Sequence, residues 1–222
     1  MNKINNFLII LYGPPGSGKS TQGMILEKKL GACRLVMGDI FREIAKTNTS
    51  LGKKIKKVIE AGALFDDKMT LMILTSKIRK LKKMDKIIID GFPRDVGQAR
   101  AFDKYVSDSL GNKILFIHIR LPRANILDRL AKRRVCVNCN FITRVKKTNK
   151  NNRCPKCGGQ MMVRYDENKK AIKARLDVYS LQSRLLRQYF RKRVLEVDGN
   201  QTISKVSRDL INGIKKYFLK RT

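Results

Sequence analysis

The sequence predicts an α/β fold in which helices flank a parallel sheet. Three short and continuously apolar runs, at 7–12, 86–90 and 114–119, have the length and character of strands buried in such a sheet. Charged stretches with helical spacing separate these runs, and a glycine-rich loop directly follows the first of them. An alternation of strands and helices is typical of a layered α/β domain.

The remaining elements follow the same alternation. A first helix is expected at 22–30, where four apolar residues carry helical spacing, and the run at 194–197 is a further strand candidate. Further helices are expected at 51–60, 68–83, 123–132 and 174–193. The segment 136–159 breaks the pattern, because it is rich in Asn, Lys, Gly and Cys and lacks helical periodicity. We expect it to be an inserted subdomain held together by a metal.

Composition limits the class of protein. The chain has 222 residues, enough for one core with small inserts, and no apolar run approaches the roughly 18 residues that a membrane span needs. We see no targeting segment and expect a cytoplasmic protein with no membrane association. The 50 Lys and Arg against 18 Asp and Glu give a formal net charge of +32. Such a charge either attracts a polyanion, in weak nonspecific association with nucleic acid, or reflects solvated faces rich in lysine.

The loop GPPGSGKS at 13–20 matches the phosphate-loop pattern and stands between a strand and a helix, as its chemistry requires. Its glycines let successive N–H groups point at phosphate oxygens, and the helix N-terminus adds its positive dipole end. Lys19 is placed to bridge the β- and γ-phosphates of a nucleotide, and Ser20 to contact Mg²⁺. Asp90, at the end of a predicted strand, would hold the same metal. The fold is therefore expected to be of the phosphate-loop NTPase type.

Two Cys-x-x-Cys pairs predict a metal site. Cys136 and Cys139 are separated by 14 residues from Cys154 and Cys157, and two glycines follow the second pair, as in a four-thiolate zinc ribbon. A metal would replace the hydrophobic core that so short a polar insert cannot build. The alternatives are an Fe–S cluster or two disulfides. This use of cysteine favours a reducing compartment.

Several further segments resemble the motifs of adenylate kinases of the type with a zinc-containing lid. They are GDIFR at 38–42, EAGALF at 60–65, DGFPR at 90–94 with Gln98, the arginine-rich segments 129–134 and 164–175, and VDG at 197–199. The resemblance spans essentially the whole chain. It implies reversible phosphoryl transfer from ATP to AMP with Mg²⁺ bound to the ATP, a structural Zn²⁺ and a monomeric state.

The resemblance also implies three groups of site residues. The catalytic group is Lys19, Asp90, Arg94, Arg133, Arg164 and Arg175. The ATP-binding group is Gly16, Ser17, Gly18, Lys19, Ser20, Thr21, Arg129, Arg133, Ile142, Thr143 and Gln201. The AMP-binding group is Met37, Arg42, Ala63, Leu64, Phe65, Gly91, Phe92, Pro93, Arg94, Gln98, Arg164 and Arg175. Planar arginine forks suit the gripping of phosphates, and catalysis of this kind is mostly alignment and charge stabilisation.

The resemblance further implies a core domain formed by 1–35, 66–131 and 168–222. It implies a helical monophosphate-binding subdomain at 36–65 and a zinc-binding lid at 132–167. Asp166 and Glu167 match lid carboxylates that align the arginines, whereas the lone His118 is expected to be a strand residue without a catalytic role.

Some positions depart from the family pattern and leave alternatives open. Met37 stands where these enzymes usually carry a threonine that helps recognise the AMP base, and Lys132 replaces a usual glycine beside the lid. One alternative is a kinase for UMP, CMP or another monophosphate. A different class of alternative is a zinc-ribbon nucleic-acid-binding protein with an attached ATPase, suggested by the charge and by the basic residues Lys146, Lys147, Lys150 and Arg153 of the ribbon. Against it, the ribbon offers only Phe141 for base stacking.

Overall fold

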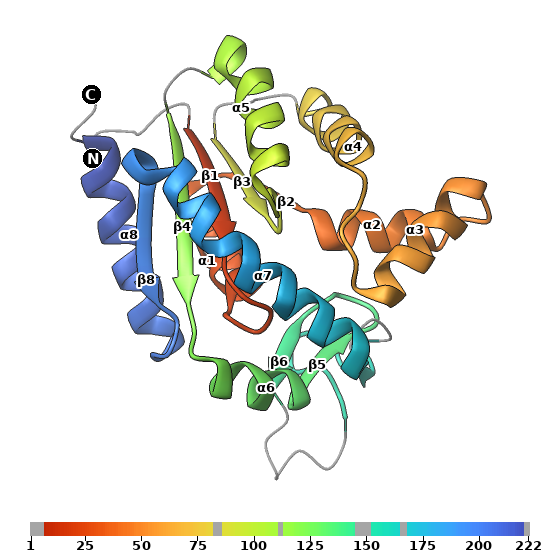
Figure 1. Cartoon of the computed structure of the whole chain (residues 1–222). Coiled ribbons are helices and arrows are strands. Elements are labelled where there is room, and N and C mark those ends of the chain that lie inside the picture. The colour runs from red at the N-terminus through yellow and green to blue at the C-terminus, as the bar shows by residue number, and fades with distance from the viewer. Residues whose placement is uncertain (1–6, 82–85, 111–112, 145–151, 165–167, 220–222) are drawn as a thin grey trace.

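A five-stranded parallel sheet lies at the centre of the chain, with strand order β2-β3-β1-β4-β8 (Figure 1). The computed structural model describes residues 7–81, 86–110, 113–144, 152–164 and 168–219. The strands are β1 (Phe7–Tyr12), β2 (Cys33–Val36), β3 (Lys86–Asp90), β4 (Ile114–Arg120) and β8 (Val194–Asp198). The four strands expected from apolar runs are confirmed, and β2 is an additional edge strand beside β3.

Helices cover both faces of this sheet. They are α1 (Lys19–Leu30), α2 (Met37–Ala45), α3 (Ser50–Ala61), α4 (Asp67–Arg79), α5 (Val96–Leu110), α6 (Arg123–Ala131), α7 (Lys169–Tyr189) and α8 (Ile203–Leu219). A single 3₁₀ turn, Arg191–Arg193, joins α7 to β8. In Figure 1, α7 runs across the sheet from β8 toward the small strands β5 and β6. The predicted parallel sheet flanked by helices is confirmed.

Two hydrophobic cores lie on the two faces of the sheet, because side chains alternate along each buried strand. Along β1, Leu8 and Ile10 pack with residues of α4, α5 and α7, whereas Ile9 and Leu11 pack with residues of α1 and α8. All six residues of β1 are buried. Burial on both faces explains why the central strands read as continuous apolar runs in the sequence.

Side-chain caps decide where several helices begin. The Asp66 carboxylate accepts a hydrogen bond from the Met69 N–H (2.8 Å), and the Asn168 amide oxygen accepts one from the Ala171 N–H (2.8 Å). Each bond satisfies a backbone donor that the first helical turn leaves without a partner. The α7 helix therefore begins at Lys169, five residues before the start expected from its periodicity.

The insert that follows α6 forms its own antiparallel sheet. The strands β5 (Arg133–Cys136), β6 (Ile142–Arg144) and β7 (Met161–Met162) have the order β6-β5-β7. As expected, this segment is not a layer of the main core. Figure 1 shows β5 and β6 beside α6 and the N-terminal half of α7. Within the described residues, no helix combines the length and the apolar character needed to cross a membrane.

Candidate active site

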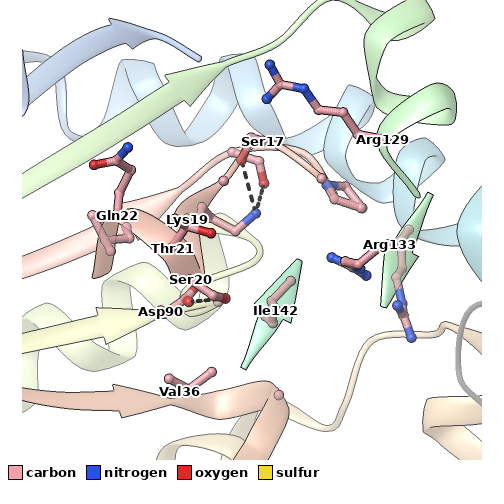
Figure 2. Close-up of a pocket in the computed structure, with 18 of the residues that line it drawn as sticks. Ser17, Lys19, Ser20, Thr21, Gln22, Val36, Asp90, Arg129, Arg133 and Ile142 are labelled. Atoms are coloured by element: carbon pink, nitrogen blue, oxygen red, sulfur yellow. Dashed lines mark hydrogen bonds between the residues drawn. The ribbon is translucent and has the colours of Figure 1, made fainter. Parts of the chain in front are cut away.

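The glycine-rich loop turns sharply between β1 and α1. Gly18 adopts a φ of 98°, a conformation that side chains disfavour, and Lys19 begins the helix directly after it. The Lys19 ammonium donates hydrogen bonds to the Gly13 carbonyl (2.7 Å) and the Pro14 carbonyl (2.9 Å). These contacts curl the loop around the lysine (Figure 2). The loop therefore has the form that surrounds nucleotide phosphates with N–H groups.

A hydroxyl and a carboxylate meet beside this loop. Ser20 Oγ donates a hydrogen bond to Asp90 Oδ2 at 2.8 Å (Figure 2). Asp90 ends β3, and the parallel register pairs it with Leu11, two residues before the loop. Its side chain is buried, with the Arg34 guanidinium 3.9 Å away. Oxygen donors at this position are the kind that Mg²⁺ accepts together with nucleotide phosphates.

A cavity of about 870 Å³ opens in front of the loop. Phosphate-loop residues line one part of it, and residues of α2, the 62–65 segment, α7 and the small sheet line the rest. The predicted site residues that line it are Gly16, Ser17, Gly18, Lys19, Ser20, Thr21, Arg42, Ala63, Leu64, Phe65, Asp90, Gly91, Pro93, Arg94, Arg129, Arg133, Ile142, Thr143, Arg164, Arg175 and Gln201. The fold thus brings together residues that lie as much as 185 positions apart in the sequence.

Positive charge is concentrated around this cavity. The pKa of Arg94 is lowered to about 10, chiefly by burial and then by the positive charges of Arg175 and Arg42, with Asp90 and Tyr12 opposing the shift. Burial likewise lowers the pKa of Lys19 to about 8, where Asp90 opposes the shift and Arg133 and Arg94 add to it. Like charges gathered in a partly desolvated site favour an anion between them.

The arginines come from different elements. Arg42 lies on α2 and pairs with Asp39, and Arg94 Nε donates to the Gly91 carbonyl at 3.3 Å. Arg129, on α6, donates to the Gly199 carbonyl at 2.9 Å. Figure 2 shows Arg129 and Arg133 on the side of the cavity that α6 and the small sheet form. A movement of the small sheet relative to the core would change the distance between Arg133, which lies on β5, and the phosphate loop.

Three predicted site residues do not line the cavity. Met37 and Phe92 are each 1% exposed, and Phe92 packs edge-on against Phe102 with ring centroids 5.3 Å apart. The Gln98 amide is held on both sides: its oxygen accepts from the Arg94 N–H (2.9 Å) and its nitrogen donates to Asp67 Oδ1 (3.0 Å). Base-recognition roles for Met37 and Gln98 therefore stay predictions.

Several cavity residues were missed in the sequence. Phe41 was not predicted; its ring stacks on that of the predicted residue Phe65 with centroids 3.9 Å apart, and both line the cavity. Phe41 belongs to the GDIFR motif, and that motif could have pointed to it as a cavity residue. Tyr12 and Tyr179 also line the cavity. Tyr12 ends an apolar strand and Tyr179 lies in the middle of a charged helix. Neither position belongs to a sequence motif that would mark it as a cavity residue.

The four predicted metal ligands form one cluster. The Sγ atoms of Cys136, Cys139, Cys154 and Cys157 all lie within 4.8 Å of one another, and the cysteines are not in disulfides. Three sulfur pairs are separated by 3.3, 3.5 and 3.7 Å. Four thiolates about 2.3 Å from a tetrahedral zinc would lie about 3.8 Å apart, so this donor set fits Zn²⁺. Phe141 and Met161 pack beside the cluster.

Other predicted lid residues cannot be placed. Asp166, Glu167, Lys146, Lys147 and Lys150 lie outside the described residues.

The parallel sheet, the phosphate loop and the four-cysteine insert over one cationic cavity define a phosphate-loop protein that binds nucleotides. The adenylate kinase family model matches residues 11–195 of the chain. The adenylate kinase of Borrelia garinii subsp. bavariensis is 35% identical over 207 residues, covering 91% of this chain and 96% of the relative. That of Desulforudis audaxviator is 36% identical over 207 residues, with 91% and 97% covered. That of Borrelia turicatae is 35% identical over 213 residues, with 94% and 99% covered. The chain belongs to the adenylate kinase family and is a phosphoryl-transfer enzyme.

Proposed function

We propose that this protein catalyses the reversible transfer of a phosphoryl group from ATP to AMP, giving two ADP. The observation that carries the proposal is the single cavity that the phosphate loop and the arginines of α2, β5 and α7 line together. A donor triphosphate and an acceptor monophosphate can meet in one such space. In-line transfer between them requires little covalent help beyond alignment and charge stabilisation.

At the donor side, the phosphate loop holds the triphosphate. Lys19 exchanges its bonds to the Gly13 and Pro14 carbonyls for bonds to the β- and γ-phosphates. Ser20 and Asp90 would hold Mg²⁺, which would supply positive charge to the phosphate oxygens. Arg129 and Gln201 contact the donor nucleoside, with Ile142 and Thr143 of β6 closing over it. The buried Gln201 Oε1, which has no hydrogen-bond partner among the described residues, supports such a contact.

At the acceptor side, Arg42 and Arg94 grip the α-phosphate of the monophosphate. The base lies near Phe41, Phe65 and the backbone of 62–64. Arg133, Arg164 and Arg175 act on the transferring phosphoryl group. Clustered cations of this kind stabilise the charge that spreads over the phosphoryl oxygens in the transition state. No protein general base is needed.

The chain divides by role into three parts. Residues 1–35, 66–131 and 168–222 form the core, and 36–65 the monophosphate-binding subdomain. The four-cysteine lid, 132–167, closes over the donor phosphates, bringing in arginines and excluding the water that would hydrolyse ATP. A structural Zn²⁺ bound by the four thiolates would hold the lid together. A monomeric state, a cytoplasmic location and weak association with nucleic acid stay predictions.

The second candidate is a kinase for another nucleoside monophosphate. It is favoured by Met37, whose buried side chain offers no hydroxyl to the cavity where the family usually has a threonine. Gln98 favours AMP, because beyond its bonds to Arg94 and Asp67 its amide keeps one acceptor site and one N–H that match the adenine edge, although in this structure the side chain is buried and does not line the cavity. A matched pair in a dry pocket discriminates more strongly than one hydroxyl, so AMP remains the first choice.

A coupled assay tests both candidates. ATP with Mg²⁺ is offered with AMP, UMP, CMP or GMP, and kcat/KM is measured for each. A preference for AMP supports the proposal. If another monophosphate is used at least as well, the acceptor assignment is wrong although the fold and chemistry remain.

A further inference from the structure

Tyr12 lines the nucleotide cavity and carries a buried hydroxyl that has no hydrogen-bond partner among the described residues. It is the last residue of β1, lies next to Gly13 and is only 7% exposed. Buried polar side-chain atoms nearly always have a partner, since desolvating one without a bond opposes folding. A group in this state at the wall of a binding cavity indicates a partner that the cavity receives.

Aromatic neighbours fix the position of the Tyr12 ring. Its centroid lies 5.2 Å from Phe116, 5.6 Å from His118 and 5.6 Å from Tyr179. The Tyr179 hydroxyl is engaged elsewhere, 2.9 Å from His118 Nε2. The ring of Tyr12 is therefore packed on the core side, and its hydroxyl is held in place without being satisfied by these neighbours.

The charges around Tyr12 suit an anionic partner. Burial is the largest cause that raises the pKa of Tyr12, Tyr179 adds to it, and the positive charges of Arg94 and Arg187 oppose it. The net direction is upward, so the phenol stays protonated at neutral pH and remains a donor. Arg94 in turn responds to Tyr12, and both residues line the same cavity.

We propose that the Tyr12 hydroxyl donates a hydrogen bond to the phosphate of the nucleoside monophosphate that Arg94 grips. The ligand group is a phosphate monoester, whose oxygens accept several donors at once. The inference rests on the proposed function for the presence of a monophosphate, but it concerns the phosphate and is independent of the base.

The test is Tyr12→Phe, which removes the oxygen and keeps the ring. We expect the KM for AMP to rise at least about tenfold, the usual loss for one hydrogen bond to a charged group, with the KM for ATP little changed. Thermal stability should be unchanged or higher, because no bond within the protein is lost. Tyr189→Phe is the matched control. Its hydroxyl donates to Asp103 Oδ2 at 2.8 Å and does not line the cavity, so this variant should lose stability and keep its kinetics.

Calorimetric titration with AMP and with adenosine distinguishes the contribution of the phosphate to binding from that of the nucleoside. Loss of affinity for AMP but not for adenosine in Tyr12→Phe supports the proposal. An unchanged KM for AMP overturns it, and so does a rise confined to ATP. If wild-type protein prefers another monophosphate, the same comparison is made with that monophosphate and its nucleoside, so the acceptor assignment can fail while this inference stands.

Discussion

The protonated, charged forms of the cations around the cavity are disfavoured in the free protein, and a bound nucleotide would favour them. Lys19 and Arg94 both have lowered pKa values, with burial as the largest cause and neighbouring cations adding to it. Phosphates placed between them would supply the opposite charge and favour the protonated forms. In the proposed function, Lys19 and Arg94 would thus serve binding and catalysis more than the stability of the free protein.

Replacing Lys19 by methionine is expected to lower kcat by about 10²–10³-fold, the usual effect of removing one preorganised charge from the transition state. The same substitution at Lys28, which is exposed on the outer side of α1, serves as the control and should leave turnover unchanged. A coupled assay measures both variants, and thermal unfolding verifies that they fold. Undiminished turnover by Lys19→Met would remove the phosphate loop from the mechanism.

His118 is the single histidine of the chain, so its titration can be followed without overlap. It lies on β4, as expected, with Nδ1 3.3 Å from Glu196 and Nε2 2.9 Å from Tyr179, and Arg187 and Arg120 are near the same carboxylate. Burial lowers the pKa of His118 below its ordinary 6.5, although Glu196 opposes the shift. The imidazole is therefore neutral at pH 7.

The free energy of unfolding should consequently fall as the pH drops through about 6.5. In that range His118 is protonated more readily in the unfolded chain than in the folded protein, so the unfolded state binds more protons. NMR titration of the one imidazole gives the folded-state pKa, and urea unfolding at several pH values gives the slope. His118→Gln should lack this part of the slope. A measured pKa above 6.5 would contradict the prediction.

At the level of elements, the sequence alone was sufficient to predict the strands that are buried on both faces of the sheet. Runs such as IIL in β1 and III in β3 have no polar positions to interrupt them, because helices cover both sides. The strand β2 was missed because it is short, lies at the edge and contains Arg34. The helix α8 was missed although its signal was present: Val206, Leu210 and Ile214 are buried at intervals of four residues.

The site was predictable where a local motif carries the chemistry. The phosphate loop and the cysteine pairs act through spacing in the chain, so their residues could be named from the sequence. Tyr12 could not, because its place at the cavity depends on packing between distant elements. The strands of the lid, two to four residues each, are likewise fixed by pairing across an insert and not by local pattern.

The lid is expected to depend on its metal. Elemental analysis of protein purified without chelator should find about one zinc per chain, and Cys136→Ser should reduce this and lower thermal stability, because metal binding replaces a core there. Cys33→Ser is the matched control, since Cys33 lies on β2 outside the cluster and should keep the zinc. Protein without zinc and with four unreactive, oxidised thiols would favour disulfides.

At the scale of the whole molecule, the formal net charge of +32 is the dominant electrostatic fact. Ion pairs such as Arg193–Asp103 (2.6 Å) and Arg34–Glu27 (3.2 Å) contribute locally. Basic residues nevertheless outnumber acidic ones 50 to 18, so the carboxylates cannot neutralise most of the positive charge. Self-repulsion at this charge destabilises the compact state, and added salt screens it.

The melting temperature should therefore rise as NaCl is increased from 20 to about 200 mM, over which the Debye length falls from roughly 20 to 7 Å. A variant carrying Lys53→Glu and Lys57→Glu, at two exposed positions of α3, lowers the net charge from +32 to +28 and should melt higher at low salt with a flatter salt dependence. A matched Lys53→Arg and Lys57→Arg variant keeps the charge and should follow the wild type. Calorimetry at several salt concentrations measures all three. A melting temperature that falls as salt is added would contradict the prediction. It would mean that attractive ion pairs outweigh the net repulsion, so that the excess of lysine does not destabilise the folded protein.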